Sequence, residues 1–279
     1  MYPAQKRSSQ KPRMENMSTK KLYASKVAQD SRPEKSGIQV IERAADILRT
    51  VAQSPRGLSL GEIALHVGLA RSTVQRIVDA LTKENLLMGA SASHGVKLGP
   101  ALIALGAATH FPITDLVRPT LEALAKRTGE TVDLSLATRD EMIFLDQVPG
   151  THRLAAVSSV GVTFPLHCSA NGKAAVALMN ESELKRVRKT LGLARQTANT
   201  ITDWESFDSE LTRVRQTGVA YDREETSVGI CAIAKAFRSH AGDLVAISIP
   251  VPTMRFTANE SDLVNVLELE FNVLLKKLR

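Results

Sequence analysis

The feature that most constrains the fold is a run of three helical patterns separated by very short turns between residues 38 and 84. The first pattern has apolar residues at helical spacing, namely Ile38, Ile41, Ala45, Leu48 and Ala52, and the Ser-Pro-Arg-Gly segment at 54–57 breaks it. Ser59 and Glu62 form a capping box that starts a second, short helix. Gly68 ends that helix, so only two residues separate it from the third.

The third helix is predicted from about Arg71 to Glu84, with one apolar stripe made by Val74, Ile77, Val78 and Leu81 and a polar opposite face. Two short apolar stretches follow, at 86–88 and 96–98, and the small polar loop between them indicates a hairpin. A helix, a helix-turn-helix and a hairpin together make a winged helix. The sequence therefore predicts a winged helix-turn-helix domain over residues 37–99.

The start of the third helix carries residue types that read DNA. In helix-turn-helix proteins, side chains near the N-terminus of the second motif helix contact base edges, while neighbouring groups hold phosphates. Arg71 and Arg76 can neutralise phosphate or pair with guanine. Gln75 can pair with adenine, and Ser72 and Thr73 can anchor the backbone. The alternative is a polar face that is merely solvated, but the capped preceding helix, the tight turn and the hairpin favour double-stranded DNA as a partner.

The hairpin loop at 89–95 would then lie along the adjacent groove of the DNA.

The charge distribution adds a second, weaker indication of an anionic partner. The 279 residues contain 36 Lys and Arg against 29 Asp and Glu, a net charge of +7. Residues 1–36 hold nine basic and three acidic residues, residues 37–99 carry a net +2, and residues 100–279 carry a net −1. Because residues 1–36 also lack apolar periodicity, they are predicted to form a disordered basic arm. The expectation of specific DNA binding thus depends on residues 59–98.

A second domain is predicted over residues 112–279, after a linker helix at 100–111 and a boundary at Pro112. Alternating stretches predict strands at about 131–137, 142–148, 153–158, 218–222, 230–237 and 244–251. Helices are predicted at about 114–127, from near Ser169, after capping boxes at Asn180/Glu183 and Thr202/Glu205, and over about 259–277. Helices that separate groups of strands indicate an α+β domain with a mostly antiparallel sheet.

Several function classes are disfavoured by what the chain lacks. Cys168 and Cys231 are too few for a disulfide framework, and no Cys or His spacing suits zinc. No apolar run approaches the ~20 residues of a membrane span, and the N-terminus lacks the apolar core of a signal peptide. We therefore expect a cytoplasmic protein with no metal, cofactor or membrane partner.

The motifs together resemble those of IclR-type bacterial transcriptional regulators. The segment from Ile38 to Leu87, followed by ValLysLeuGlyProAlaLeuIleAlaLeuGly at 96–106, is similar to their winged helix. The segments at 165–177, 218–234 and 244–252 resemble three landmarks of their effector domain, in family order and spacing. The resemblance implies a winged helix joined by a linker helix to a GAF-like effector domain, in a dimer or a dimer of dimers. A dimer on a near-palindrome also makes physical sense, because one helix-turn-helix reads few bases.

The resemblance also implies an effector site between the first landmark and the later strands. Carried over to this chain, it comprises Ala170, Asn171, Asp222, Ala232, Ser248 and Pro250. Ala232 stands where many members have Cys or Ser, and Pro250 replaces a frequent Ser. Both departures remove a polar contact, so we expect a small organic effector, a carboxylate that can be aromatic, that is less polar than a small keto acid.

Other roles for these residues stay open at this level. Lys173 lies in the first turn of a helix, where the dipole disfavours a cation, so it needs a ligand carboxylate or an acidic side chain as its partner. Asp222 could simply close a turn, and Ser248 could be a core hydroxyl. An enzyme built on His167, Cys168 and Asp222 is one rival function, although no nucleophile motif supports it. An effector-independent architectural DNA binder is the other.

Overall fold

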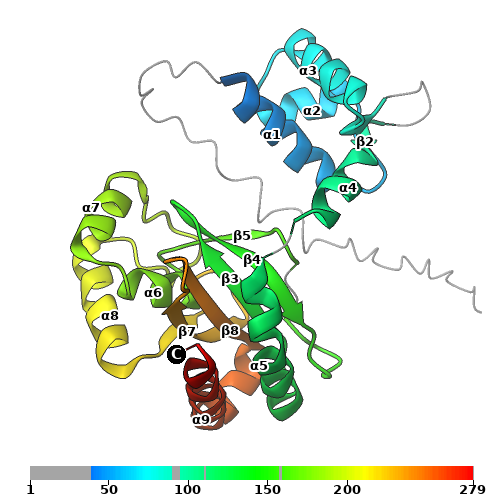
Figure 1. Cartoon of the computed structure of the whole chain (residues 1–279). Coiled ribbons are helices and arrows are strands. Elements are labelled where there is room, and N and C mark those ends of the chain that lie inside the picture. Colours follow the sequence, from blue (N-terminus) through cyan, green and yellow to red (C-terminus); the bar gives the residue numbers. More distant parts are fainter. Residues whose placement is uncertain (1–38, 90–94, 110, 157–158, 279) are drawn as a thin grey trace, which may run out of the picture. The chain divides into compact units, whose positions relative to one another are not determined.

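The computed structural model describes residues 39–89, 95–109, 111–156 and 159–278. The predicted arm at 1–36 and most of the predicted hairpin loop lie outside these ranges. The chain divides into two compact units, Met1–His110 and Phe111–Arg279 (Figure 1). None of the described helices has the length and apolar character that crossing a bilayer requires.

The first unit has the winged helix-turn-helix fold that the sequence predicts. It consists of α1 (Gln39–Ala52), α2 (Leu60–Val67), α3 (Arg71–Lys83), β1 (Leu87–Met88), β2 (Lys97–Leu98) and α4 (Ala101–Ala107). The strands β1 and β2 pair antiparallel, and Leu58 bridges to Val96 beside them. The core consists of Ile47, Val51, Ile63, Val74, Ile77, Val78, Leu87 and Val96. Apolar stripes on three short helices thus meet in one small core.

Local signals determine where α2 begins and ends. The N–H of Glu62 donates to Ser59 Oγ at 3.2 Å, and the N–H of Ser59 donates to Glu62 Oε2 at 2.8 Å. This reciprocal capping box satisfies two backbone donors at the helix start. Gly68 has φ +65° and ends the helix in the left-handed conformation that glycine adopts without strain. The turn into α3 is therefore tight and fixed.

The second unit is an α+β domain. It contains α5 (Pro112–Thr128), β3 (Val132–Ala137), β4 (Glu141–Val148), β5 (Thr163–Pro165), α6 (Ala170–Ala177), α7 (Glu181–Thr190), α8 (Trp204–Thr217), β6 (Ala220–Arg223), β7 (Ile230–Arg238), β8 (Leu244–Pro252) and α9 (Thr253–Lys277). The strand order is β5-β4-β3-β8-β7-β6, and every neighbouring pair is antiparallel. The predicted antiparallel sheet is therefore confirmed.

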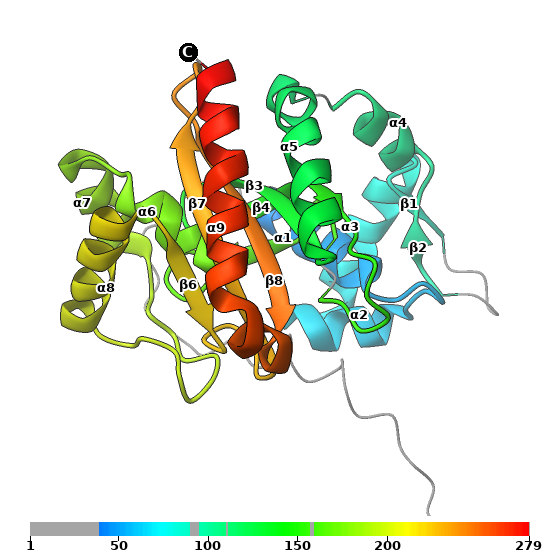
Figure 2. The same ribbon diagram turned by 90° about the horizontal axis from the view of Figure 1, so that it is seen from below.

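The two faces of this sheet have different chemistry. One face is aliphatic and packs against α5 and α9, with Val132, Leu134, Ile233, Ile247 and Ile249 among its residues. Figure 2 shows α9 lying along β7 and β8, whereas α7 and α8 lie at the left of the view. The opposite face carries small residues, among them Ala220, Ala232, Ala234 and Ala246, and packs against α6. Small side chains let α6 lie close to the strands.

One predicted element, the strand at 153–158, is wrong in the part of it that the structure describes. No strand forms at 153–156; instead the next strand is β5, in which Phe164 pairs with Met142. This segment makes a side-chain contact in place of strand pairing: Arg255 Nη2 donates to the carbonyl of Leu154 at 2.7 Å. The alternation of polar and apolar residues there does not reflect a strand.

Two helix starts also differ from the sequence expectation. The N-cap of α8 is Asp203, whose Oδ1 accepts from the N–H of Ser206 at 2.8 Å, and not Thr202. Both residues favour the N-cap position, so sequence alone does not separate neighbours of this kind. The last helix begins at Thr253, directly after β8 and without a side-chain cap, rather than near Asn259.

Candidate functional site

The predicted DNA-reading residues lie together on one face of α3. Arg71, Ser72, Gln75 and Arg76 are exposed, and Thr73 is half-buried. The opposite face buries Val74, Ile77 and Val78 in the core of the first unit. The amphipathic pattern thus presents a polar face near the N-terminus of α3.

The N-terminus of α3 differs from that of α2 because no side chain caps it. Its N-cap residue is Ala70, whose carbonyl accepts from the N–H groups of Thr73 and Val74 at 2.9 and 3.1 Å. The first N–H groups of a helix have no partner within the helix, and together with the helix dipole they favour an anion. Arg71 and Ser72 therefore present free backbone donors beside their own side chains.

Side-chain bonding on this face separates the glutamine from the arginines. Gln75 Nε2 donates to Asp79 Oδ1 at 2.7 Å, one turn further along the helix. Arg71 and Arg76 make no hydrogen bond or ion pair with any residue that the structure describes. The two guanidinium groups can thus bind an outside anion, whereas Gln75 must give up Asp79 to contact a base. Asp79 is not among the residues that the sequence pattern predicts to read DNA.

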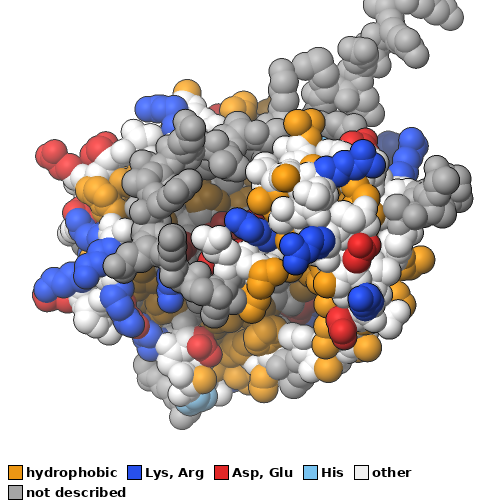
Figure 3. Space-filling model, turned by 90° about the horizontal axis from the view of Figure 1, so that it is seen from above, with side chains coloured by type: hydrophobic (Ala, Val, Ile, Leu, Met, Phe, Trp, Pro, Cys, Tyr) orange, Lys and Arg blue, Asp and Glu red, His pale blue; other side chains and the backbone are white. Residues whose placement is uncertain are grey.

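Basic residues do not dominate the face of the molecule that Figure 3 shows. On that face, Lys and Arg side chains are interspersed with acidic, apolar and other polar ones. This agrees with the modest net charge of the chain beyond residue 36. The described residues on this face therefore do not form one continuous basic surface.

The six predicted effector residues lie together in one layer between α6 and the sheet, which we call the effector layer. Asp222, Ala232 and Pro250 are direct neighbours across β6, β7 and β8. Ser248 lies between Ala234 on β7 and Asp133 on β3. Because side chains alternate along a strand, these positions share the face that packs against α6.

The start of α6 is joined to the sheet in this layer. Asn171 Nδ2 donates to Ser135 Oγ on β3 at 3.0 Å, and the side chain of Asn171 is buried. Ser169 caps the helix by accepting from the N–H of Gly172 at 3.2 Å. Ala170, the first residue of α6, is buried as well. The helix start is therefore fixed by polar contacts on both sides.

Asp222 closes a turn, which is one of the roles left open by the sequence. Its Oδ1 accepts from the N–H groups of Glu225 and Thr226 at 2.7 and 3.3 Å. Burial, which outweighs these bonds and the nearby Lys173, raises the pKa of Asp222 above its ordinary value. The carboxyl group is thus committed to the loop between β6 and β7.

Lys173 is a buried ion-pair residue. It is 1% exposed, and its Nζ lies 2.5 Å from Glu225 Oε1 and 3.1 Å from Glu210 Oε1. Arg213 Nη2 lies 2.7 Å from Glu210 Oε1 and adds a second cation. Although burial raises the pKa of Glu210, its bonds with Arg213 and Lys173 together hold that pKa below its ordinary value. We call Lys173, Glu210, Asp222 and Glu225 the buried charge cluster.

Glu225 is the least satisfied member of this cluster. Its Oε2 is buried and has no hydrogen-bond partner among the residues that the structure describes. Burial, together with nearby Asp222 and Glu210, outweighs the attraction of Lys173 and raises the pKa of Glu225 to about 7. The sequence analysis anticipated an acidic partner for Lys173 but did not identify it. The adjacent pair Glu224–Glu225 in the second landmark segment was the available signal.

The proposed catalytic set of His167, Cys168 and Asp222 does not form a nucleophilic site. Burial raises the pKa of the Cys168 thiol to about 12, so the thiol stays protonated near neutral pH. His167 Nε2 lies 3.0 Å from the carbonyl of Ala194 and contacts the backbone there. Within the described ranges, no group of three His, Cys, Asp or Glu residues is placed to hold a metal ion.

Comparison with known proteins identifies the family. Residues 40–88 match the IclR helix-turn-helix domain, and residues 105–269 match the C-terminal domain of bacterial IclR transcriptional regulators. The chain belongs to the IclR family. It is therefore a transcriptional regulator with a DNA-binding helix-turn-helix, and it is not an enzyme.

Individual relatives extend over most of the chain. The HTH-type transcriptional regulator Rv1719 of Mycobacterium tuberculosis is 44% identical over 86% of this chain and 91% of its own length. The crystal structure of an IclR transcriptional regulator from Alicyclobacillus acidocaldarius is 27% identical, covers 86% of this chain and 98% of its own, and has a TM-score of 0.71. An IclR homologue from Microbacterium hydrocarbonoxydans, crystallised with 4-hydroxybenzoate, covers 86% and 99% with a TM-score of 0.69 and 21% identity, which supports the fold.

Proposed function

We propose that this IclR-family regulator binds a near-palindromic promoter site as a dimer or a dimer of dimers in the cytoplasm. A small organic effector bound in the effector layer would change its affinity for double-stranded DNA. The observation that carries the proposal is the polar face of α3, with unpaired Arg71 and Arg76 beside an uncapped helix N-terminus.

The DNA contacts follow from the chemistry of that face. Arg71 and Ser72, at the helix start, would hold a phosphate with their side chains and backbone N–H groups. Arg76 and Gln75, one turn further, would reach base edges in the major groove. Thr73 is half-buried, so it would contact the DNA backbone only with the exposed part of its side chain.

Support for a second copy comes from α4. None of its residues is buried, and Ile103 and Leu105 are 76% and 59% exposed. An apolar helix of this kind gains stability when another apolar surface covers it. The same helix of a second copy would do so and would pair two DNA-reading heads, as a near-palindromic site requires.

The expected effector is a small organic acid of limited polarity. Ala232 and Pro250 face the layer without side-chain donors, while Asn171 and Ser248 supply polar contacts at its edges. The homologue crystallised with 4-hydroxybenzoate supports an aromatic carboxylate as the first class to test. Binding would favour one arrangement of the paired heads, which couples the effector to DNA affinity.

The test of the DNA-reading face uses Arg71→Ala combined with Arg76→Ala. Each lost arginine contact typically costs ~1–3 kcal/mol, so we expect the double variant to lose specific affinity by about 30-fold or more. The operator is first selected from random double-stranded DNA with the full chain, and affinities are then measured at one salt concentration. Arg49→Ala is the matched control, because Arg49 is an exposed arginine paired with Asp46 at 2.7 Å on α1. An operator footprint retained in the double variant would refute the assignment.

The effector layer is tested separately by release of that operator with a panel of aromatic and aliphatic acids. Asp222→Asn keeps an oxygen acceptor for the loop but removes the charge, so it should shift the dose–response curve. Asp262→Asn, on the exposed side of α9, should leave it unchanged. If the two variants respond alike, the effector does not bind in this layer.

A further inference from the structure

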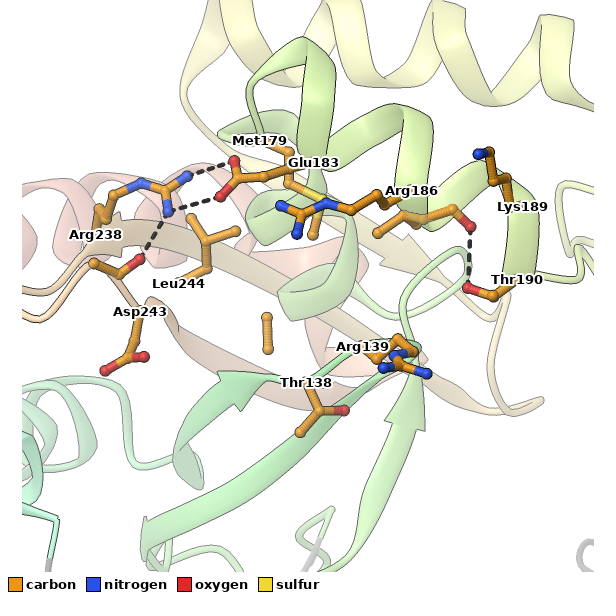
Figure 4. Close-up of a pocket in the computed structure, with 13 residues that line it drawn as sticks. Thr138, Arg139, Met179, Glu183, Arg186, Lys189, Thr190, Arg238, Asp243 and Leu244 are labelled. Atoms are coloured by element: carbon orange, nitrogen blue, oxygen red, sulfur yellow. Dashed lines mark hydrogen bonds and ion pairs between the residues drawn. The ribbon is translucent and has the colours of Figure 1, made fainter. Parts of the chain in front are cut away.

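A cavity of about 520 Å³ opens in the second unit at a place that none of the six predicted effector residues lines. It is bounded by the turn between β3 and β4, by α7, and by the turn between β7 and β8 (Figure 4). Four of its lining residues are cations, namely Arg139, Arg186, Lys189 and Arg238. We call it the basic cavity.

The basic run of α7 is sorted by face. Outside the cavity, Lys185 pairs with Glu181 at 3.8 Å, and Arg188 pairs with Asp208 and lies over the Trp204 ring. The two cations of the run that line the cavity, Arg186 and Lys189, pair with no residue that the structure describes. The same helix therefore satisfies its outward cations and leaves its cavity-facing ones free.

Arg139 is a third free cation, contributed by the turn between β3 and β4. It also has no hydrogen-bond or ion-pair partner among the described residues. In Figure 4, Arg186 lies on the α7 side of the open space and Arg139 on the strand side. An anion between them would meet guanidinium groups from two separate elements.

The acidic groups nearby do not cancel these cations. Glu183 is bound by Arg238 at 3.1 and 2.9 Å and accepts from the N–H of Asn180 at 2.9 Å. That pair is neutral as a unit. Asp243 accepts from Ser239, and its carboxylate extends away from Arg186 in Figure 4. Asp140 does not line the cavity, and its Oδ1 accepts from Thr190 Oγ1 at 2.5 Å.

Apart from Thr138 and Thr190, the remaining lining has no polar side chain. Val187 and Leu244 are buried, and Met179 is half-buried beside them. Ligand sites usually have volumes of about 300–1,000 Å³ and combine an apolar lining with a few convergent polar groups. The basic cavity has that composition, with cationic groups at its rim and aliphatic groups inside.

We propose that the basic cavity is a second ligand site, which binds an organic carboxylate with an apolar body. The carboxylate lies between Arg139, Arg186 and Lys189, where guanidinium groups form charge-assisted, forked hydrogen bonds. The apolar body covers Val187, Leu244 and Met179. This site is independent of the proposed effector layer.

The test uses the full chain labelled with ¹³C at its methionine methyl groups and titrated with benzoate. Met179 lines the basic cavity, whereas Met254 is 89% exposed on α9 and does not line it. We expect a saturable shift of the Met179 signal, with the Met254 signal unchanged. The two signals are assigned with Met179→Leu and Met254→Leu.

Two neighbouring residues of α7 provide matched variants. Arg186→Gln should weaken benzoate binding at Met179 tenfold or more, while Lys185→Gln should leave it unchanged, since hydrogen bonds to charged groups contribute strongly. Benzyl alcohol, which has the same ring without the charge, should bind more weakly than benzoate. The proposal is overturned by no saturable Met179 shift, by an equal shift of Met254, by equal effects of the two variants, or by equal binding of benzyl alcohol.

Discussion

The DNA-reading face of α3 and the buried charge cluster of the second unit use their cations in opposite ways. Arg71 and Arg76 of the first unit are exposed and unpaired among the described residues, whereas Lys173 of the second is 1% exposed and lies between two carboxylates. An exposed charge is solvated by water and needs no partner, but a buried one must be compensated within the fold. Free cations are therefore available to another molecule, whereas compensated ones belong to the internal architecture.

Helix starts also differ in how they are capped, although this difference does not separate the two units, since α4, α5 and α9 lack a side-chain cap as α3 does. Side chains of Ser59, Ser169, Asn180 and Asp203 cap α2, α6, α7 and α8. At α3 the corresponding residue is Ala70, which has no side-chain acceptor. A cap would occupy the N–H groups that a phosphate uses. The uncapped start of α3 thus costs some helix stability and leaves a site for DNA.

The largest expected effect comes from Lys173→Met. It leaves Glu225, Glu210 and Asp222 with one cation fewer in a buried site, and breaking a buried ion pair typically costs about 3–5 kcal/mol. Urea unfolding followed by the fluorescence of Trp204, the single tryptophan, should show this loss. Arg71→Ala should change stability by no more than about 0.5 kcal/mol. Part of the loss should return in the Lys173→Met/Glu225→Gln double variant; an unchanged midpoint for Lys173→Met would contradict the role of the cluster.

The next effect is a pH dependence of the second unit. Because the pKa of Glu225 rises from 4.5 to about 7 on folding, the folded state holds a proton that the unfolded chain releases. Its contribution to stability is full below about pH 4.5 and is lost as the pH rises through about 7. The Trp204-detected midpoint should fall from about pH 5 to about pH 8, and Glu225→Gln should flatten the fall. An identical slope in the variant would exclude Glu225 as its source.

The first unit should respond to pH in the opposite direction. Hydrogen bonds from Ser59 lower the pKa of Glu62 in the capping box of α2. The associated stability is present above the unfolded pKa and is lost as the pH falls through the lower folded value. Circular dichroism measures the helix content at acidic pH. The difference in helix content between the parent and Glu62→Gln reports the contribution of the capping box.

A smaller loss is expected for Asp222→Ala. The N–H groups of Glu225 and Thr226 would lose their acceptor in a buried turn, which typically costs about 1–3 kcal/mol. Asp222→Asn keeps an oxygen in place and should lose less. Comparing the two in urea unfolding separates the turn from the charge; equal losses would show that the charge, not the acceptor, matters.

Ala70→Asp tests the uncapped start of α3. It should supply a cap and leave the first unit at least as stable, yet weaken specific DNA binding about tenfold, because the new carboxylate occupies the N–H groups and repels phosphate. Ala80→Asp places the same charge on an exposed position further along α3 and serves as the control. Equal losses of affinity in the two variants would mean that general repulsion, not the helix start, is responsible.

The smallest expected effect on specificity comes from deleting residues 1–36, which carry a net charge of +6. Nonspecific affinity and its salt dependence should both decrease, because fewer counterions are released from DNA. The operator footprint should stay the same. A shifted footprint would show that the arm takes part in operator choice.

The sequence predicted best what neighbouring residues determine. The capping boxes Ser59/Glu62 and Asn180/Glu183 join residues three apart, and both helices begin where those boxes indicate. The alternation at 153–158 was misleading, because a strand forms only where a partner strand is available. The edge of β4 pairs with β5 instead. Local pattern alone does not contain this choice.

Contacts between distant segments were beyond the sequence. Lys173 was expected to need an acidic partner, but Glu210 and Glu225 reach it only once α8 and the loop after β6 pack beside α6. The basic cavity likewise combines three separate segments of the chain. The DNA-reading residues were easier to find because all of them lie within two turns of one helix. Their roles, and those of the six effector-layer residues, stay predictions.

The two ends of the sheet have a consequence for the behaviour of the protein in a crowded cell. The edge strand β5 has three residues and includes Pro165, which has no N–H to donate, and the opposite edge strand β6 has four and carries Arg223, paired with Glu260 at 2.6 Å. Short edges with proline or charge are poor templates for a strand from another chain. Aggregation by sheet extension is thereby discouraged, and stable association of copies is left to helical surfaces.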